Sequence, residues 1–299
     1  NIFQPNLILL LGAGALRAAK GTYRDKKNKE KQFPIGDWRG SCWLCQEFNS
    51  PFYNYKVLAT YHPSYLMKVY PEIPLVRQDL KRARLHGTYK EMPSEDLKLD
   101  TAPQVDTICA RLKAIRDHNL TISIDIEGYV GDMSCIGISA SPKEAFIIPF
   151  SANDGGNYWS EDDEVRIWTE LSQTISSPTV PKILENGMYY AFVLAYSYKT
   201  PVGNQAEDTL IKNWSLYCEY PKDLGFLTSL WTEHPHYKAE GKSEDEQTFW
   251  RYCCKDAAIT YEICERQSTV LKNQAKEHYQ FMINTIPAFM YIELRGMRL

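Results

Sequence analysis

The sequence predicts an α/β protein with two domains. Strand-like runs alternate with helix-like runs along the chain, and three strand-like runs follow one another closely at 121–128, 133–140 and 144–150. The length of 299 residues allows two domains, and an apolar fraction of 44% is ample for their cores. We therefore expect a mixed sheet flanked by helices, preceded by a smaller α/β domain.

Composition favours a soluble, cytoplasmic protein without a membrane partner. No run approaches the roughly 18 apolar residues of a membrane span, and the chain opens on no charged and apolar leader. The 8 cysteines include the adjacent Cys253 and Cys254, which do not suggest a disulfide framework in a chain of this length.

The charge is distributed unevenly along the chain. Residues 1–100 carry 16 Lys and Arg against 10 Asp and Glu, whereas the remaining residues carry 18 against 27. A basic front part suits contact with a polyanion, and an acidic back part suits metal ions that bridge to phosphate.

The front part begins with a buried strand that turns through Gly12 and Gly14 into a helix, over residues 6–19. A second strand over 55–60 leads through a His-Pro-Ser turn into a helix near residues 79–82. The polar segment 87–103, with two prolines, reads as a domain linker.

Helix signals surround the three-strand meander. An amphipathic helix is expected over 106–117 with Asp106 as its N-cap, and another should start at Ser160. A strand at 180–184 runs into a helix at 188–194, and Ser243–Glu246 has the form of a capping box before the last long helix.

Asp125 and Glu127 are the first candidate site residues. They lie two apart in a strand, so their side chains project from the same face of the sheet, where they can converge on hard cations. Such a pair is often only the solvated face of a strand. Here the neighbouring strands favour a covered position, where unpaired carboxylates would be costly.

Tyr252 and Asp256 are the second pair. They lie four apart on the predicted last helix and therefore share one of its faces.

Together these motifs resemble the DEDD 3′–5′ exonucleases. The signatures are Asp-x-Glu on a first strand, an Asn-x-x-Tyr element at Asn186 to Tyr189 with Tyr190 directly after it, and Tyr-x-x-x-Asp on a late helix. The tyrosine resembles that of the DEDDy branch, and the whole is similar to the proofreading domain of a family A DNA polymerase. Asp208-Thr209 matches a further landmark, and residues 284–297 resemble the start of the polymerase region.

The resemblance implies an RNase H-like mixed-sheet exonuclease. Asp125, Glu127 and Asp256 would hold two Mg²⁺ or Mn²⁺ ions, and Tyr252 would orient the water that attacks the 3′-terminal phosphodiester of single-stranded primer DNA. The family's second motif ends in an aspartate that anchors the second ion, and this chain has Tyr190 there. We therefore expect a weak second metal site. Three explanations are open: the exonuclease domain has impaired activity, position 190 was altered from an aspartate, or another acid such as Asp208 substitutes for that aspartate.

The front part resembles the C-terminal half of the uracil-DNA glycosylases, over about residues 6–84. The similar features are Leu-Gly-Ala-x-Ala-Leu, an Arg-Gly loop at Arg39, and Thr-Tyr-His-Pro-Ser-Tyr-Leu. By this resemblance His62, Leu66, Met67 and Arg39 would contact DNA. The motif that positions the catalytic water is missing, and Cys42 and Cys45 do not match the family's four cluster cysteines, so we expect no uracil excision.

The expected domains are a partial glycosylase-like domain at 1–86, a linker at 87–103, an exonuclease domain at 104–271, and a truncated polymerase start at 272–299. A glycosylase-like segment ahead of such an exonuclease suggests a bacteriophage polymerase, located in the host cytoplasm and continuous with its polymerase region. The alternative is an inactive exonuclease-like module that grips primer or template. An RNA-trimming exonuclease fits less well because residues 284–297 continue into polymerase-like sequence.

Overall fold

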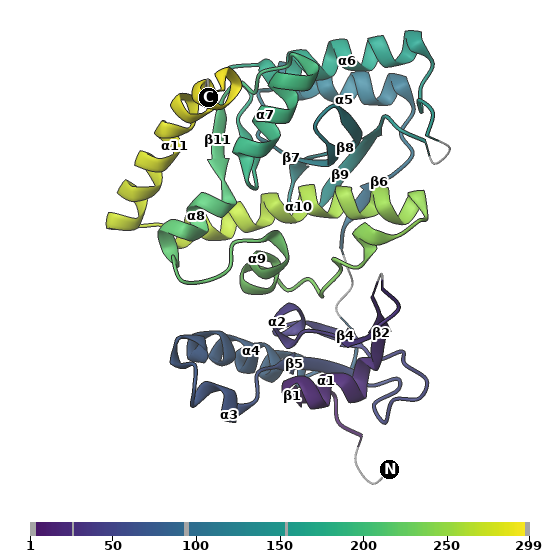
Figure 1. Ribbon diagram of the computed structural model, residues 1–299, viewed down its shortest axis with the longest axis vertical. Helices are drawn as coiled ribbons and strands as arrows, with labels where there is room; N and C mark the ends of the chain where they lie inside the picture. The colour runs from purple at the N-terminus through teal and green to yellow at the C-terminus, as the bar shows by residue number, and fades with distance from the viewer. Residues whose placement is uncertain (1–3, 26, 93–95, 153–154, 297–299) are drawn as a thin grey trace. The chain divides into compact units, whose positions relative to one another are not determined.

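The computed structural model describes residues 4–25, 27–92, 96–152 and 155–296. The chain divides into two compact units, which are drawn in Figure 1. The first unit contains Asn1–Glu95 together with Gly225–Tyr237, and the second contains Asp96–Leu224 together with Lys238–Leu299.

The first unit is built on a three-stranded sheet in the order β1-β5-β4, with β1 parallel and β4 antiparallel to β5. Its strands are β1 (Ile8–Leu11), β4 (Cys42–Leu44) and β5 (Lys56–Thr60), with a separate hairpin of β2 (Thr22–Arg24) and β3 (Glu30–Gln32). Its helices are α1 (Gly12–Lys20), α2 (Ile35–Trp38), α3 (Pro63–Leu66), the 3₁₀ turn η1 (Tyr70–Glu72) and α4 (Ile73–His86). The predicted passage from a first strand into a helix is confirmed.

Gly12 makes this passage possible. It has a φ of +82°, which favours glycine, and a Cβ there would lie 2.8 Å from the Cβ of His62. The turn between β1 and α1 therefore lies directly against the His-Pro-Ser turn.

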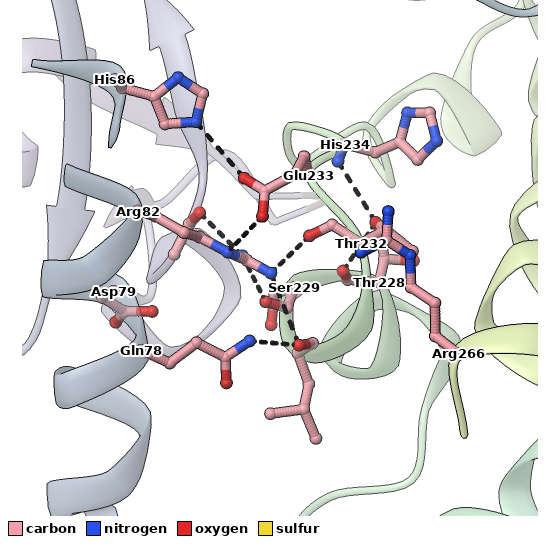
Figure 2. Close-up of polar contacts among 12 residues, drawn as sticks. Gln78, Asp79, Arg82, His86, Thr228, Ser229, Thr232, Glu233, His234 and Arg266 are labelled. Carbon is pink, nitrogen blue, oxygen red and sulfur yellow. Dashed lines mark hydrogen bonds and ion pairs between the residues drawn. The ribbon is translucent and has the colours of Figure 1, made fainter. Parts of the chain in front are cut away.

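A segment distant in sequence completes the first unit. Helix α9 (Leu224–Trp231) begins it, and Gly225–Tyr237 pack with the first unit although they lie between Asn186 and Tyr252 in the sequence. Figure 2 shows the buried guanidinium of Arg82 on α4 reaching this segment, where it donates to the carbonyl oxygens of Ser229 (2.6 Å) and Thr232 (2.5 Å). Nothing in the local sequence pattern indicated this arrangement.

The second unit is built on a six-stranded mixed sheet in the order β11-β10-β7-β8-β9-β6. The strands are β6 (Lys98–Asp100), β7 (Ile122–Tyr129), β8 (Asp132–Ser141), β9 (Glu144–Pro149), β10 (Lys182–Leu184) and β11 (Gln205–Asp208). Strands β7, β8 and β9 form the predicted antiparallel meander, and β10 and β11 continue the sheet parallel to β7. This order is the RNase H-like arrangement, and the predicted fold class is confirmed.

Helices cover both faces of this sheet. They are α5 (Val105–Asp117), α6 (Glu161–Ser176), α7 (Gly187–Tyr198), α8 (Thr209–Leu216), the 3₁₀ turn η2 (Glu240–Lys242), α10 (Glu246–Val270) and α11 (Asn273–Arg295). Figure 1 shows α5 and α6 on one side of the sheet and the long α10 crossing the other side. The alternation along β7 matches these layers, because Ile122, Ile124 and Ile126 belong to the core beneath α5 and α6.

The helix starts confirm one predicted cap and correct two. Ser160 caps α6 as predicted, since its side chain accepts from the backbone N–H of Asp163. Helix α5 begins one residue earlier than predicted, with Gln104 at the N-cap, so Asp106 is in its first turn and is not the cap. Helix α10 is capped by Asp245, which accepts from the N–H of Thr248, and the capping box starting at Ser243 was therefore wrong.

Candidate active site

Strand β7 presents Asp125 and Glu127 on the face toward α10. The strand is central in the sheet, between β10 and β8, and Asp125 is 3% exposed. The hydroxyl of Ser123, on the same face, donates to the carbonyl oxygen of Ala257 on α10 (2.6 Å). The period of the strand and its place in the sheet therefore put both carboxylates beneath the helix.

Helix α10 brings Tyr252 and Asp256 to the same place. Its close approach depends on Gly137 of β8, which pairs with Asp125, because a Cβ at Gly137 would lie 2.7 Å from the carbonyl oxygen of Cys253. The Cys253 thiol lies 3.6 Å from the carbonyl oxygen of Asp125. A residue with any side chain at position 137 would push the helix, and Asp256 with it, away from β7.

The three carboxylates form one cluster. Asp125, Glu127 and Asp256 each offer an oxygen, and these oxygens lie within 4.8 Å of one another. Burial, and then the charge of Asp256, raises the pKa of Asp125. Burial, and then the charge of Asp125, raises the pKa of Glu127. Negative charge is thus concentrated where water is largely excluded, and a cation would relieve it.

The donor set fits a hard divalent ion. Carboxylate oxygens are the ligands that Mg²⁺ and Mn²⁺ prefer. Oδ2 of Asp125 is buried and has no hydrogen-bond partner among the residues that the structure describes. An orphaned carboxylate oxygen in such a cluster is costly unless an ion or water completes it. Asp125, Glu127 and Asp256 could therefore hold a metal.

Tyr190 lies beside Asp125, at the position where the sequence resemblance calls for an aspartate. It is carried by α7, whose N-cap Asn186 has a φ of 55°. The Tyr190 hydroxyl donates to Oδ1 of Asp125 (2.8 Å). Burial and the charge of Asp125 raise the pKa of Tyr190 well above its usual value, so it stays a neutral phenol.

Asp208 does not replace the missing carboxylate. Its side chain accepts from the N–H of Ile211 (3.0 Å), as the cap of α8, and from the N–H of Gly187 (2.8 Å). These contacts hold the start of α7 and the start of α8 together. The suggestion that Asp208 substitutes as a metal ligand is thus not supported. Its side chain has a structural role instead, as an acceptor for backbone N–H groups.

Sequence reasoning missed two charged residues near the cluster. Lys238 donates to Oδ2 of Asp256 (2.6 Å) and lies 3.1 Å from the Tyr252 hydroxyl, with its ammonium 4.9 Å from the centre of the Tyr252 ring. No motif or period marks this lysine in the sequence. Burial, and then the charges of Asp208 and Asp125, raises the pKa of Glu185 to about 8. Glu185 directly precedes Asn186, and that adjacency was a signal that could have found it.

The proposed DNA-contacting residues lie in different surroundings. Met67 is 75% exposed, Leu66 is half-buried, and His62 is exposed with Nδ1 accepting from the N–H of Ser64 (3.1 Å). Arg39 corrects the expectation for that residue: it is 0% exposed and pairs with the buried Asp79 (2.5 Å). Its guanidinium is therefore not presented to a DNA strand.

Comparisons with known proteins give only distant likenesses. No protein-family model matches the chain, and no curated protein matches it. A nuclease solved in its apo form is 18% identical, with a TM-score of 0.48, and the match covers 67% of this chain and 93% of that one. NrnC of Brucella melitensis is 15% identical, with a TM-score of 0.49, over 67% of this chain and 93% of that chain.

A polymerase is among the similar structures. The POL domain of Pol1 from M. smegmatis, in complex with DNA primer-template and dNTP, is 16% identical with a TM-score of 0.44. The match covers 65% of this chain and 30% of that chain. At these identities and TM-scores, the likenesses do not assign an activity to this chain.

Among the described residues, no helix combines the length and the apolar character that crossing a bilayer requires.

Proposed function

We propose that this chain is the 3′–5′ exonuclease portion of a family A DNA polymerase, acting on the 3′ end of single-stranded primer DNA with Mg²⁺ or Mn²⁺. The observation that carries the proposal is the convergence of Asp125, Glu127 and Asp256, from a strand and a helix about 130 residues apart in sequence, on one buried cluster beside Tyr252. A proofreading role and a phage origin rest on the sequence resemblance.

The clustered carboxylates and Tyr252 would have different roles in the reaction. Asp125, Glu127 and Asp256 would hold the divalent ions. Bound there, such ions lower the pKa of water and neutralise charge on the attacking and leaving oxygens of a phosphodiester. The Tyr252 hydroxyl, on the same helix face as Asp256, would orient the attacking water. Burial and the charge of Asp256 raise the pKa of Tyr252, so this group acts as a neutral donor.

Tyr190 limits the proposed activity. The cluster offers three carboxylates to two divalent ions, and a phenol is a poor ligand at neutral pH. The hydrogen bond from Tyr190 also occupies Oδ1 of Asp125. Hydrolysis by the chain as it stands should therefore be weak.

The same contact favours a second candidate function. A module whose metal site is partly filled by a phenol could grip primer or template DNA without cutting it. The exposed aromatic side chains of Tyr129 (78%) and Tyr189 (39%) belong to the same unit and suit stacking on bases. Binding without hydrolysis would distinguish this candidate from the enzyme.

A 5′-labelled primer incubated with Mg²⁺ or Mn²⁺ tests the proposal. Slow laddering from the 3′ end, abolished by Asp125→Ala and by Asp256→Asn, is the expected result, and Tyr190→Asp should accelerate it. If the Tyr190→Asp variant is folded, binds the primer and leaves it intact, the chain is a binding module and the enzymatic proposal fails. An RNA primer of the same sequence measures the preference for DNA.

The domain assignment is part of the proposal. We propose a glycosylase-like segment at 1–86, an exonuclease domain at 104–271 and a polymerase start at 272–299, of which Asn273–Arg295 form α11. Within 104–271, Gly225–Tyr237 belong to the first unit and stand apart from the exonuclease domain. We expect the first unit to leave uracil in DNA. Abasic sites in a uracil-containing oligonucleotide, lost on His62→Ala, would contradict this expectation.

A further inference from the structure

Lys238 is placed as a cation within the proposed metal cluster. Its ammonium contacts Oδ2 of Asp256 (2.6 Å) and the hydroxyl of Tyr252 (3.1 Å). The side chain of Asp256 is 4% exposed and that of Lys238 is 24% exposed. The lysine thus brings its charge from the edge of the site to one of the three clustered carboxylates.

The charge count changes when Lys238 is included. Asp125, Glu127 and Asp256 carry three negative charges when ionised, and Tyr190 adds none. One ammonium leaves a surplus of two negative charges, which a single divalent ion balances. A second divalent ion would meet a cluster that is already neutral and would leave it with two surplus positive charges. It would also compete with Lys238 for Asp256, because both are attracted to the same oxygen.

We propose that Lys238 is a built-in counter-charge that takes the place of one divalent ion, so that the cluster binds one Mg²⁺ or Mn²⁺ rather than two. This inference rests on the metal site of the proposed function. The remaining ion is expected at Asp125, whose buried Oδ2 has no partner among the described residues, whereas Asp256 already has the lysine. Lys238 acts through Asp256 and Tyr252 as a positioning residue.

Counting Mn²⁺ ions tests the proposal without measuring activity. Calorimetric titration and equilibrium dialysis should give one Mn²⁺ per unmodified chain. Lys238→Met removes the charge at similar length, and we expect the ion to bind about tenfold tighter or more and a second ion to become measurable. Lys238→Arg keeps the charge and should keep the count at one. Lys242→Met removes a charge from an exposed position nearby and should change nothing.

A double variant sharpens the test. Tyr190→Asp alone should take a second Mn²⁺ weakly, because Lys238 still occupies Asp256. Adding Lys238→Met should tighten that second ion further, and the two effects should exceed their sum if both act on the same position. Additive effects would mean that the lysine and the second ion use separate places, which contradicts the proposal.

The outcomes separate this inference from the proposed function. Two tight Mn²⁺ ions in the unmodified chain overturn it, whether or not Lys238→Met folds. Unchanged Mn²⁺ affinity in a folded Lys238→Met variant also overturns it and leaves the lysine a structural partner of Asp256. If the Mn²⁺ counts follow the lysine but no variant degrades a primer, the exonuclease proposal fails and the counter-charge stands.

Discussion

Tyr190→Asp should make the stability of the second unit depend strongly on divalent ions. The substitution removes a half-buried ring that packs against the main core, and it places a fourth carboxylate beside Asp125. Loss of a packed aromatic ring costs on the order of 3 kcal/mol, and repulsion between the new carboxylate and Asp125 adds to this cost. Without metal, the variant should therefore melt at a clearly lower temperature than the unmodified chain.

Metal should reverse that loss. A ligand that binds only the folded state stabilises it by about 2.7 kcal/mol at 100 times its dissociation constant. Saturating Mn²⁺ should therefore restore most of the stability of Tyr190→Asp, while it raises the melting temperature of the unmodified chain less. The same ions should raise primer hydrolysis by about 100-fold or more, equivalent to ~2.7 kcal/mol in the barrier.

Thermal melts with and without Mn²⁺, run beside single-turnover primer degradation, measure both effects. Tyr190→Phe is the matched control, because it keeps the ring and removes only the hydrogen bond to Asp125. A Tyr190→Asp variant whose melting temperature and hydrolysis ignore Mn²⁺ would refute the reasoning. Position 190 would then not face the metal site in solution.

Three further perturbations follow from the described contacts. In metal-free protein the free energy of unfolding should fall as pH rises from about 4.5 to 8, by up to ~1.4 kcal/mol per pH unit for Glu185. The reason is that the raised pKa of Glu185 keeps its carboxyl group protonated in the folded state over this pH range, whereas it ionises in the unfolded chain. Glu185→Gln should therefore reduce the slope in pH-dependent melts. Gly137→Ala should cost about 1–3 kcal/mol and weaken Mn²⁺ binding by displacing α10 at Cys253, whereas Ala in place of Gly14, where a Cβ meets no neighbour, should cost nothing in the same melts. Arg82→Met should destabilise the first unit by about 3 kcal/mol in urea titrations, because it leaves buried carbonyl oxygens such as that of Ser229 without a donor; a loss below 0.5 kcal/mol would mean that this network is not closed in solution.

The site was predictable where it depends on local spacing. Alternation along residues 122–127 fixes which side chains face the helix, because successive residues of a strand point to opposite faces. The i, i+4 spacing of Tyr252 and Asp256 fixes their shared helix face in the same way. The order of these motifs, with Asn186 between them, was enough to predict the sheet, the covering helix and three of the clustered side chains.

Capping was predictable only in part. Ser160 was identified correctly, whereas Asp106 and Ser243 each lie two positions from the residue at the N-cap of α5 and α10. Several polar residues near a helix start can accept the first N–H groups, and the packing of the helix decides which of them does.

The tertiary structure decided how the charges of the site are compensated. Lys238 and Glu185 carry no periodic signal, and they matter because burial strengthens the interaction between charges that the fold brings together. Burial likewise removed Arg39 from the surface and paired it with Asp79. Spacing along the chain determines which face a side chain occupies. Which distant group lies opposite, and how much water remains between them, depends on how strands and helices far apart in sequence pack.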